Sequence, residues 1–178
     1  TVARATLHNY EDLARKDVRV GDTVFVEKGG DVIPKVVEVL LAERPPEALP
    51  FEMPAACPEC GEPVVRYEGE VAWRCVNPDC PAILQESIRH FVSRNAMDIE
   101  GLGGERIAQL VEAKLVDDLQ SLYHLRREAL VELEGWGEKS ADKLLAELEA
   151  SKRRELHRFL FALGIRMVGE RVAKLLAR

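Results

Sequence analysis

The sequence predicts a multidomain α+β protein, because three successive segments of the chain differ in their residue patterns. Residues 1–50 contain two runs rich in β-branched residues, which favour strands. Residues 51–82 hold a proline-rich linker followed by all four cysteines of the chain. Residues 83–178 place apolar side chains at helical intervals, interrupted by glycine-bearing turns. By length alone, a chain of 178 residues could form one large domain or two to three small ones.

The first segment is expected to form a β-hairpin. Its two β-branched runs, residues 18–26 and 32–41, are separated by the turn signal Lys-Gly-Gly-Asp at 28–31. Pro34 has no backbone N–H to donate, so we expect it at the start of a strand or at a sheet edge. Two or three strands cannot close a barrel alone. This segment therefore needs further strands or packs against a neighbour.

Composition and charge indicate where the protein is located and which kinds of partner it can bind. No apolar run approaches the roughly 18 residues that a membrane span requires, and no basic-then-apolar signal segment stands at the N-terminus. We therefore expect a cytoplasmic protein with no membrane partner. The net charge of −6 argues mildly against a nucleic-acid partner, but residues 151–178 carry eight basic and two acidic side chains. This basic tail is either a solvated helix face or a phosphate-facing surface.

The four cysteines follow the spacing C-x2-C-x14-C-x4-C, which is typical of a zinc site. Four thiolates from two turns satisfy a tetrahedral Zn²⁺ and leave no open position for a catalytic water. We therefore predict a structural zinc held by Cys57, Cys60, Cys75 and Cys80. Two disulfides, an iron–sulfur site and unrelated thiols are the alternatives. His90 is expected on a helix surface and not as a fifth ligand. The module has few apolar residues, so we expect the metal to supply its folding energy.

The third segment is expected to begin with a helix, because Pro81 suits a first helical turn. Helical spacing places five apolar residues of this helix on one face: Ile83, Leu84, Ile88, Phe91 and Val92. Helical periodicity continues to Arg178, and no segment is low in complexity.

Three turns in this segment resemble one another, and their last glycines are spaced 34 and then 32 residues apart. Each turn leads into a helix with a cation in its first turn. Glycine lets the backbone bend sharply, and the unpaired N–H groups of a helix start can hold a phosphate. We therefore predict contacts to a phosphate backbone, without sequence readout, at Gly101, Gly103, Gly104, Arg106, Gly135, Gly137, Lys139, Gly169 and Arg171.

Other interpretations of these turns are plain helical hairpins or a solenoid repeat of similar period. The third turn is the weakest match, because Met167 stands where the others have their first glycine. Trp136 lies at the tip of the second turn, where we expect it to pack between helices and not to stack on a base.

Taken together, these residues resemble the downstream half of the bacterial NAD-dependent DNA ligases, over essentially the whole chain. The motifs are RATLHN at 4–9, GDVIP at 30–34, the four-cysteine spacing, IEGLG at 99–103, LEGWGEKSA at 133–141 and LFALGIRMVGE at 160–170. The resemblance implies a partial OB-type β-barrel at 1–50. It further implies a small four-cysteine zinc finger within 51–82, and an all-α helix-hairpin-helix domain at 83–178 that ends before a fourth hairpin.

The resemblance also implies the partner, nicked double-stranded DNA, bound without sequence specificity by a monomer. The loop 28–33 would approach the DNA, with Lys28 at a phosphate and with Val32 and Ile33 pressed into the minor groove. From the residues alone, Val32 and Ile33 would instead be assigned to the strand core.

The chemistry of that family depends on a lysine in a K-x-D-G motif, which attacks NAD and carries AMP in a domain that also uses Mg²⁺. No Asp-Gly pair exists in this chain. The resemblance places that domain and the first OB strands before Thr1, and a fourth hairpin and a BRCT domain after Arg178. We therefore expect a fragment that clamps nicked DNA for a ligase of replication and repair, and that is inactive alone. The alternatives are a hairpin module of another repair or recombination protein, and a helical scaffold that binds no DNA.

Overall fold

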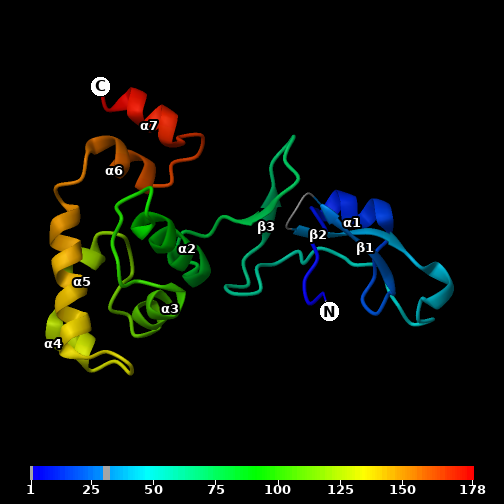
Figure 1. Ribbon diagram of the computed structural model, residues 1–178, viewed down its shortest axis with the longest axis horizontal. Coiled ribbons are helices and arrows are strands. Elements are labelled where there is room, and N and C mark those ends of the chain that lie inside the picture. The colour runs from blue at the N-terminus through cyan, green and yellow to red at the C-terminus, as the bar shows by residue number, and fades with distance from the viewer. Residues whose placement is uncertain (1, 30–32) are drawn as a thin grey trace. The chain divides into compact units, whose positions relative to one another are not determined.

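The computed structural model describes residues 2–29 and 33–178, which form two compact units, Thr1–Val76 (unit 1) and Asn77–Arg178 (unit 2). Within these residues, unit 1 contains β-hairpins and the helix α1, whereas unit 2 is helical (Figure 1). This mixed content agrees with the expected α+β class. None of the helices in the described ranges combines the length and the apolar character needed to cross a membrane.

Unit 1 begins with a helix that was not predicted, α1 (Tyr10–Lys16). The Asn9 side chain caps its start by accepting the N–H of Asp12 at 2.9 Å. The helix ends at Asp17, whose φ of 48° is left-handed and whose N–H returns to carbonyls of the last turn. The segment 18–22 is then a turn and not a strand, because Gly21 has a φ of 92°. The first strand therefore starts later than expected.

The predicted hairpin is present as β1 (Val24–Gly29) paired antiparallel with β2 (Ile33–Val39). The register runs from Val24 opposite Val39 to Gly29 opposite Ile33, with a bulge between Phe25 and Val26. Thr6 extends this sheet, since its N–H donates to the Pro34 carbonyl at 2.8 Å and its carbonyl accepts from Val36 at 3.1 Å. A short 3-10 turn, η1 (Leu41–Glu43), follows the hairpin. The second hairpin of unit 1 pairs β3 (Val64–Arg66) with β4 (Trp73–Cys75).

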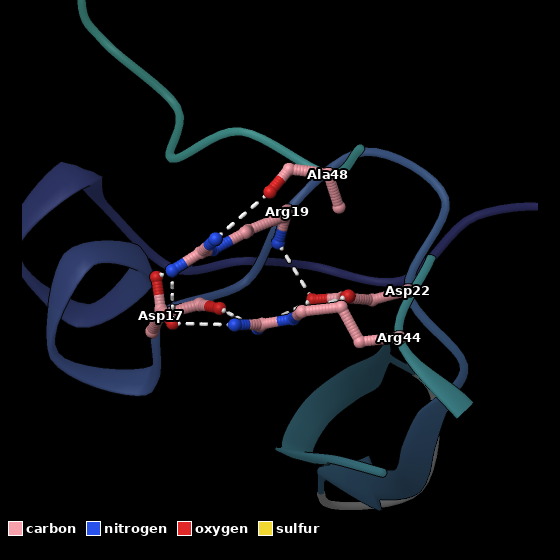
Figure 2. A network of polar contacts seen from close by, with 5 residues as sticks. All are labelled: Asp17, Arg19, Asp22, Arg44 and Ala48. Atoms are coloured by element: carbon pink, nitrogen blue, oxygen red, sulfur yellow. Dashed lines mark hydrogen bonds and ion pairs between the residues drawn. The ribbon is translucent and has the colours of Figure 1, made fainter. Parts of the chain in front are cut away.

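A network of charged side chains joins the turn after α1 to the segment after η1 (Figure 2). Arg44 donates to both carboxylate oxygens of Asp22 at 2.9 Å and to Asp17 Oδ2 at 2.6 Å. Arg19 binds Asp17 through two nitrogens, at 3.0 and 2.9 Å, and donates to the Ala48 carbonyl at 2.8 Å. The Asp22 side chain is fully buried. Hydrogen bonds from Arg19 and then Arg44 lower the pKa of Asp17 from 3.8 to about 2, and Arg44 also lowers the pKa of Asp22.

Unit 2 consists of helices that pack in consecutive pairs, α2 with α3, α4 with α5 and α6 with α7 (Figure 1). The elements are α2 (Pro81–Val92), α3 (Gly104–Glu112), η2 (Ser121–His124), α4 (Arg127–Val131), α5 (Glu138–Ser151), α6 (Leu156–Ala162) and α7 (Glu170–Leu176). One apolar cluster forms the core, and the first five of these elements each place a fully buried side chain in it: Ile88, Ile107, Leu122, Leu130 and Leu144.

Side-chain burial corrects one expectation for α2 and refines another. Ile83 is exposed, because it lies about 140° around the helix from the buried Ile88, at about 100° per residue. The expected apolar face is therefore wrong at Ile83, although Ile88, Phe91 and Val92 are buried. His90 is half-buried: its Nε2 lies 2.8 Å from the Phe161 carbonyl, and the two rings meet edge-on at 4.8 Å. Its ring thus connects α2 to α6.

Candidate metal centre and nucleic-acid interface

The first cysteine pair lies on a tight turn. The N–H of Gly61 donates to the Cys57 carbonyl at 2.9 Å, and the N–H of Cys57 donates to the Glu62 carbonyl at 2.8 Å. Gly61 has a φ of 76°, a conformation that favours glycine. This turn brings the thiols of Cys57 and Cys60 into one cluster with the other two.

The second pair is fixed at both ends by regular structure. Cys75 ends β4 opposite Val64, and Cys80 is the residue directly before α2. Between them, the Asn77 side chain accepts the N–H of Asp79 at 3.0 Å, and the Asn77 carbonyl accepts the N–H of Cys80 at 3.2 Å. Pro81 then occupies the first turn of α2, where its missing N–H costs nothing.

The donor set and its spacing fit a zinc ion. All four Sγ atoms lie within 4.8 Å of one another, and those of Cys60 and Cys75 are 3.6 Å apart. Tetrahedral zinc with bonds of about 2.3 Å places its sulfur ligands about 3.8 Å apart. A disulfide of about 2.05 Å cannot join sulfurs at the Cys60–Cys75 distance. Four soft donors, two of them on buried residues, can hold the ion in a closed site.

The three glycine turns of unit 2 share one backbone geometry. In each, the last glycine directly precedes a helix: Gly103 before α3, Gly137 before α5 and Gly169 before α7. Two residues earlier the backbone is left-handed, with φ of 96° at Gly101, 76° at Gly135 and 68° at Met167. The third turn therefore adopts the same path although methionine disfavours it.

Neither the backbone conformation nor the packing of the chain requires glycine at the positions that precede the helices. Their φ values are −81°, −116° and −78° at Gly103, Gly137 and Gly169, which any residue adopts. A Cβ atom added at any of the three would meet nothing within 4 Å, and the same holds at Gly104. By contrast, the positive φ at Gly101 and Gly135 favours glycine there. The bare backbone at the helix starts thus leaves room for a group from outside the chain.

The predicted cations of these turns are not equivalent. Lys139 and Arg171 are exposed and make no hydrogen bond or ion pair within the described residues. Arg106 is half-buried and engaged: its Nη1 donates to the Gly101 carbonyl at 3.0 Å, and its guanidinium lies 4.4 Å from the centre of the Trp136 ring. Trp136 itself is only 7% exposed, as expected for a core residue.

The end of the first hairpin places two further predicted residues at the surface. Lys28 pairs with Pro34 in the last rungs of the β1–β2 ladder, and its side chain is exposed. Ile33 is 60% exposed, so the alternative that assigned it to the strand core is wrong. Val32 lies outside the described residues.

Comparison with known families assigns the first two segments of the chain. Residues 1–48 match the model of the NAD-dependent DNA ligase OB-fold domain, and residues 56–82 match that of the NAD-dependent DNA ligase C4 zinc finger domain. These two segments of the chain are similar to two domains of the NAD-dependent DNA ligases. These matches confirm the OB-type assignment and the structural zinc, and they set the disulfide and iron–sulfur alternatives aside.

Curated relatives extend the similarity to the ligase over the whole chain. The chain is 52% identical over 178 residues to the DNA ligase of Syntrophus aciditrophicus and 56% identical over 178 residues to that of Lysinibacillus sphaericus. It is 56% identical over 177 residues to the DNA ligase of Geobacter metallireducens. These alignments cover 99–100% of this chain but 26% of each relative, so the chain spans about a quarter of the length of the ligases it matches.

Sequence reasoning missed a side chain that connects the first two glycine turns of this chain. Gln109 on α3 accepts from Trp136 Nε1 at 2.7 Å and donates to the Glu134 carbonyl at 2.9 Å. Its partners lie 27 and 25 residues further along the chain, beyond the reach of any local pattern. The one available hint is that Gln109 and Arg106 are three residues apart, and so share a helix face.

Proposed function

We propose that this chain is the DNA-binding part of an NAD-dependent DNA ligase, and that it clamps nicked duplex DNA for catalysis elsewhere in the enzyme. The whole enzyme would join a 5′-phosphate to a 3′-hydroxyl in the cytoplasm, with NAD supplying AMP and with Mg²⁺ at the catalytic domain. The chain alone would be inactive, since it has no K-x-D-G lysine. We assign residues 1–50 to a partial OB fold, 51–82 to the linker and zinc finger, and 83–178 to a helix-hairpin-helix domain, acting as a monomer.

The observation that carries this proposal is the geometry of the three glycine turns. Each combines a left-handed residue with a helix-capping glycine whose Cβ position is open. An N–H group at a helix start can hold a phosphate oxygen only where no side chain covers it. Three such turns on successive helix pairs support a surface that follows a phosphate backbone.

The contacts proposed at these turns explain binding without sequence preference. Backbone N–H groups at the starts of α3, α5 and α7 would donate to phosphate oxygens, and Lys139 and Arg171 would add positive charge. Base edges take no part in such contacts, so sequence is not read.

A glutamate that follows two of the capping glycines would repel phosphate if it stood alone. Glu138 is paired with Arg127, with 3.1 Å between Oε2 and Nη2. Glu170 accepts from Asn95 Nδ2 at 3.0 Å. Arg127 offsets the charge of Glu138, which supports phosphate binding at α5. Asn95 is uncharged, so at α7 it holds the Glu170 carboxylate in place without neutralising it.

The hairpin β1–β2 would supply the contact near the nick. Exposed Lys28 suits a phosphate, and exposed Ile33, with Val32 beside it in sequence, suits an apolar wedge in the minor groove. The zinc would act structurally, by fixing the turns that carry its four cysteine ligands.

The proposal is tested by measuring binding to nicked and intact duplexes by fluorescence anisotropy across a salt series. We expect binding that weakens steeply with salt and favours the nick. Gly137→Val should lower affinity by about tenfold, because it covers backbone N–H groups whose bonds to charged phosphate are strong.

Ala146→Val provides the matched control, since it adds similar bulk to an exposed position on the same helix. We expect Ala146→Val to bind like the unaltered chain. Equal binding by Gly137→Val and the unaltered chain, or no duplex binding at low salt, would refute the clamp and favour a scaffold that binds protein.

A further inference from the structure

The first and second glycine turns are connected to each other by side chains as well as by the shared core. The turn at 101–103 leads into α3, and the turn at 135–137 leads into α5. Two residues of α3, Arg106 and Gln109, each contact the second turn. Their contacts fall on one side of α3, because three residues along a helix return to the same face.

Gln109 uses its whole amide group on the second turn. Its Oε1 accepts from Trp136 Nε1 at 2.7 Å, and its Nε2 donates to the Glu134 carbonyl at 2.9 Å. Glu134 and Trp136 flank Gly135, the left-handed residue of that turn. One side chain therefore holds both neighbours of the residue that sets the direction of the turn.

Arg106 contacts both turns at once. Its Nη1 donates to the carbonyl of Gly101, the left-handed residue of the first turn, at 3.0 Å. Its guanidinium lies 4.4 Å from the centre of the Trp136 ring, within the range of a cation–π interaction. Lysine cannot reproduce this arrangement, because its ammonium lacks the planar shape that stacks on an aromatic face while donating in the plane.

An ion pair also links the first glycine turn to α5, the helix that follows the second turn. Lys143 Nζ on α5 lies 2.8 Å from Glu100 Oε2, and Glu100 directly precedes Gly101. The pair lowers the pKa of Glu100 and raises the pKa of Lys143, as expected when each charge stabilises the other. Both ends are largely exposed, so this contact adds orientation more than stability.

The surroundings of Trp136 argue against contact with a base. One edge of the indole is hydrogen-bonded to Gln109 and a face is covered by Arg106. The hollow beside it, of about 500 Å³, is lined by three glutamates and one arginine among others: Glu105, Glu112, Glu134 and Arg106. Negative charge around this hollow disfavours the approach of a nucleic-acid strand to the indole from this side.

We propose that Arg106, Gln109 and Trp136 form a bracket that fixes the two glycine turns relative to each other, so that they bind phosphates as one preorganised pair. All three are positioning residues under this proposal, which rests on the proposed DNA-binding function. Arg106 is thereby reassigned from a phosphate contact to the bracket. Preorganisation raises affinity because less conformational freedom is lost on binding.

The test compares duplex binding by the chain and its variants across a salt series. We expect Gln109→Leu to lower affinity by about tenfold and to reduce the slope of log K against log salt by about one phosphate contact. Gln120→Leu is the matched control, since Gln120 is exposed and lies outside the bracket, and it should bind normally. Thermal unfolding of each variant, measured in parallel, reports its effect on the fold.

Two further comparisons separate positioning from direct contact. Gln109→Leu combined with Gly137→Val should bind no more weakly than Gly137→Val alone. Once the second turn is blocked, holding it in position no longer contributes to affinity. Arg106→Lys should lose as much affinity as Arg106→Ala, whereas a phosphate contact would be largely kept by lysine.

Additive losses in the double variant, normal binding by Gln109→Leu, or retained binding by Arg106→Lys would each overturn the bracket. These outcomes differ from a failure of the proposed function. In that case the unaltered chain would not bind a duplex, or Gly137→Val would bind as well as the unaltered chain, and both proposals would fall together.

Discussion

Unit 1 and unit 2 reach an ordered structure by different means. In the described part of unit 1, the buried apolar residues are Val36, Val39, Ala48 and Cys57, whereas unit 2 contains one continuous apolar cluster contributed by most of its helices. Unit 1 instead has the Arg44 network and most of the cysteine cluster. Apolar burial is non-directional and tolerates sequence change, while ion pairs and metal ligands depend on particular atoms. The two units should therefore respond differently to metal removal, truncation and acid.

Removal of zinc is expected to have the largest effect. Structural zinc contributes about 10–16 kcal/mol of apparent binding free energy in small modules, so Cys57→Ser or a strong chelator should unfold the β3–β4 hairpin. The helical core of unit 2 should keep its amide protection in hydrogen exchange. The control is His90→Ala, which should retain one zinc per chain by metal analysis. Full protection of the hairpin without metal would contradict the contrast between the units.

Truncation of a core side chain in unit 2 should have the second-largest effect on stability. Leu144 is fully buried, so Leu144→Ala should lower the free energy of unfolding by about 2–5 kcal/mol through lost burial and a residual cavity. Leu175→Ala is the matched control, because Leu175 is 57% exposed and little burial is lost. Urea unfolding followed by circular dichroism measures both. Equal stability of the two variants would show that the cluster does not support unit 2.

Loss of Arg44 should destabilise unit 1 by a smaller amount. In Arg44→Ala, the buried Asp22 carboxylate loses two hydrogen bonds and its main source of compensating charge. Thermal unfolding of unit 1 should therefore begin at a lower temperature, while the control Arg15→Ala, on an exposed side chain, should change little. An unchanged unfolding temperature for Arg44→Ala would mean that the network does not stabilise unit 1.

The same network should make unit 1 sensitive to acid. Because the folded pKa of Asp17 is lowered from 3.8 to about 2, its stabilisation is fully present above 3.8 and is lost as the pH falls towards 2. Asp22 acts in the same direction. A thermal melt at each pH should show this loss in the unaltered chain and a smaller loss in Arg44→Ala. Parallel acid curves for the two proteins would be inconsistent with the assigned cause.

The smallest expected effect is an increase in stability. Met167 is 86% exposed and has a φ of 68°, so Met167→Gly should raise stability by about 1 kcal/mol by relieving a left-handed backbone. Met167→Ala is the control, since it removes the side chain but keeps the strain. A Met167→Gly chain no more stable than Met167→Ala would show that the third turn carries no such strain.

The parts of this protein that could be predicted are those set by neighbouring residues. The zinc ligands come in two pairs, each within a few residues, and the glycine turns depend on local backbone geometry. The pairing of β1 with β2 follows from two neighbouring β-branched runs separated by a turn signal, of which Gly30 and Asp31 lie outside the described residues. The helix α1 was missed although Asn9, Glu11 and Asp12 form a recognisable helix start, because the neighbouring β-branched runs dominated the interpretation of that segment.

By itself, the sequence determined the metal chemistry, the pairing of two neighbouring strands and the glycine-capped helices, because close spacing already brings those atoms together. Tertiary structure alone decided that Arg106 lies over Trp136 and that Asp22 is buried against Arg44, 22 residues away. It also decided that Ile33 is exposed. Burial and pairing across such separations depend on which surfaces come into contact when the chain folds, and local sequence patterns do not predict those contacts.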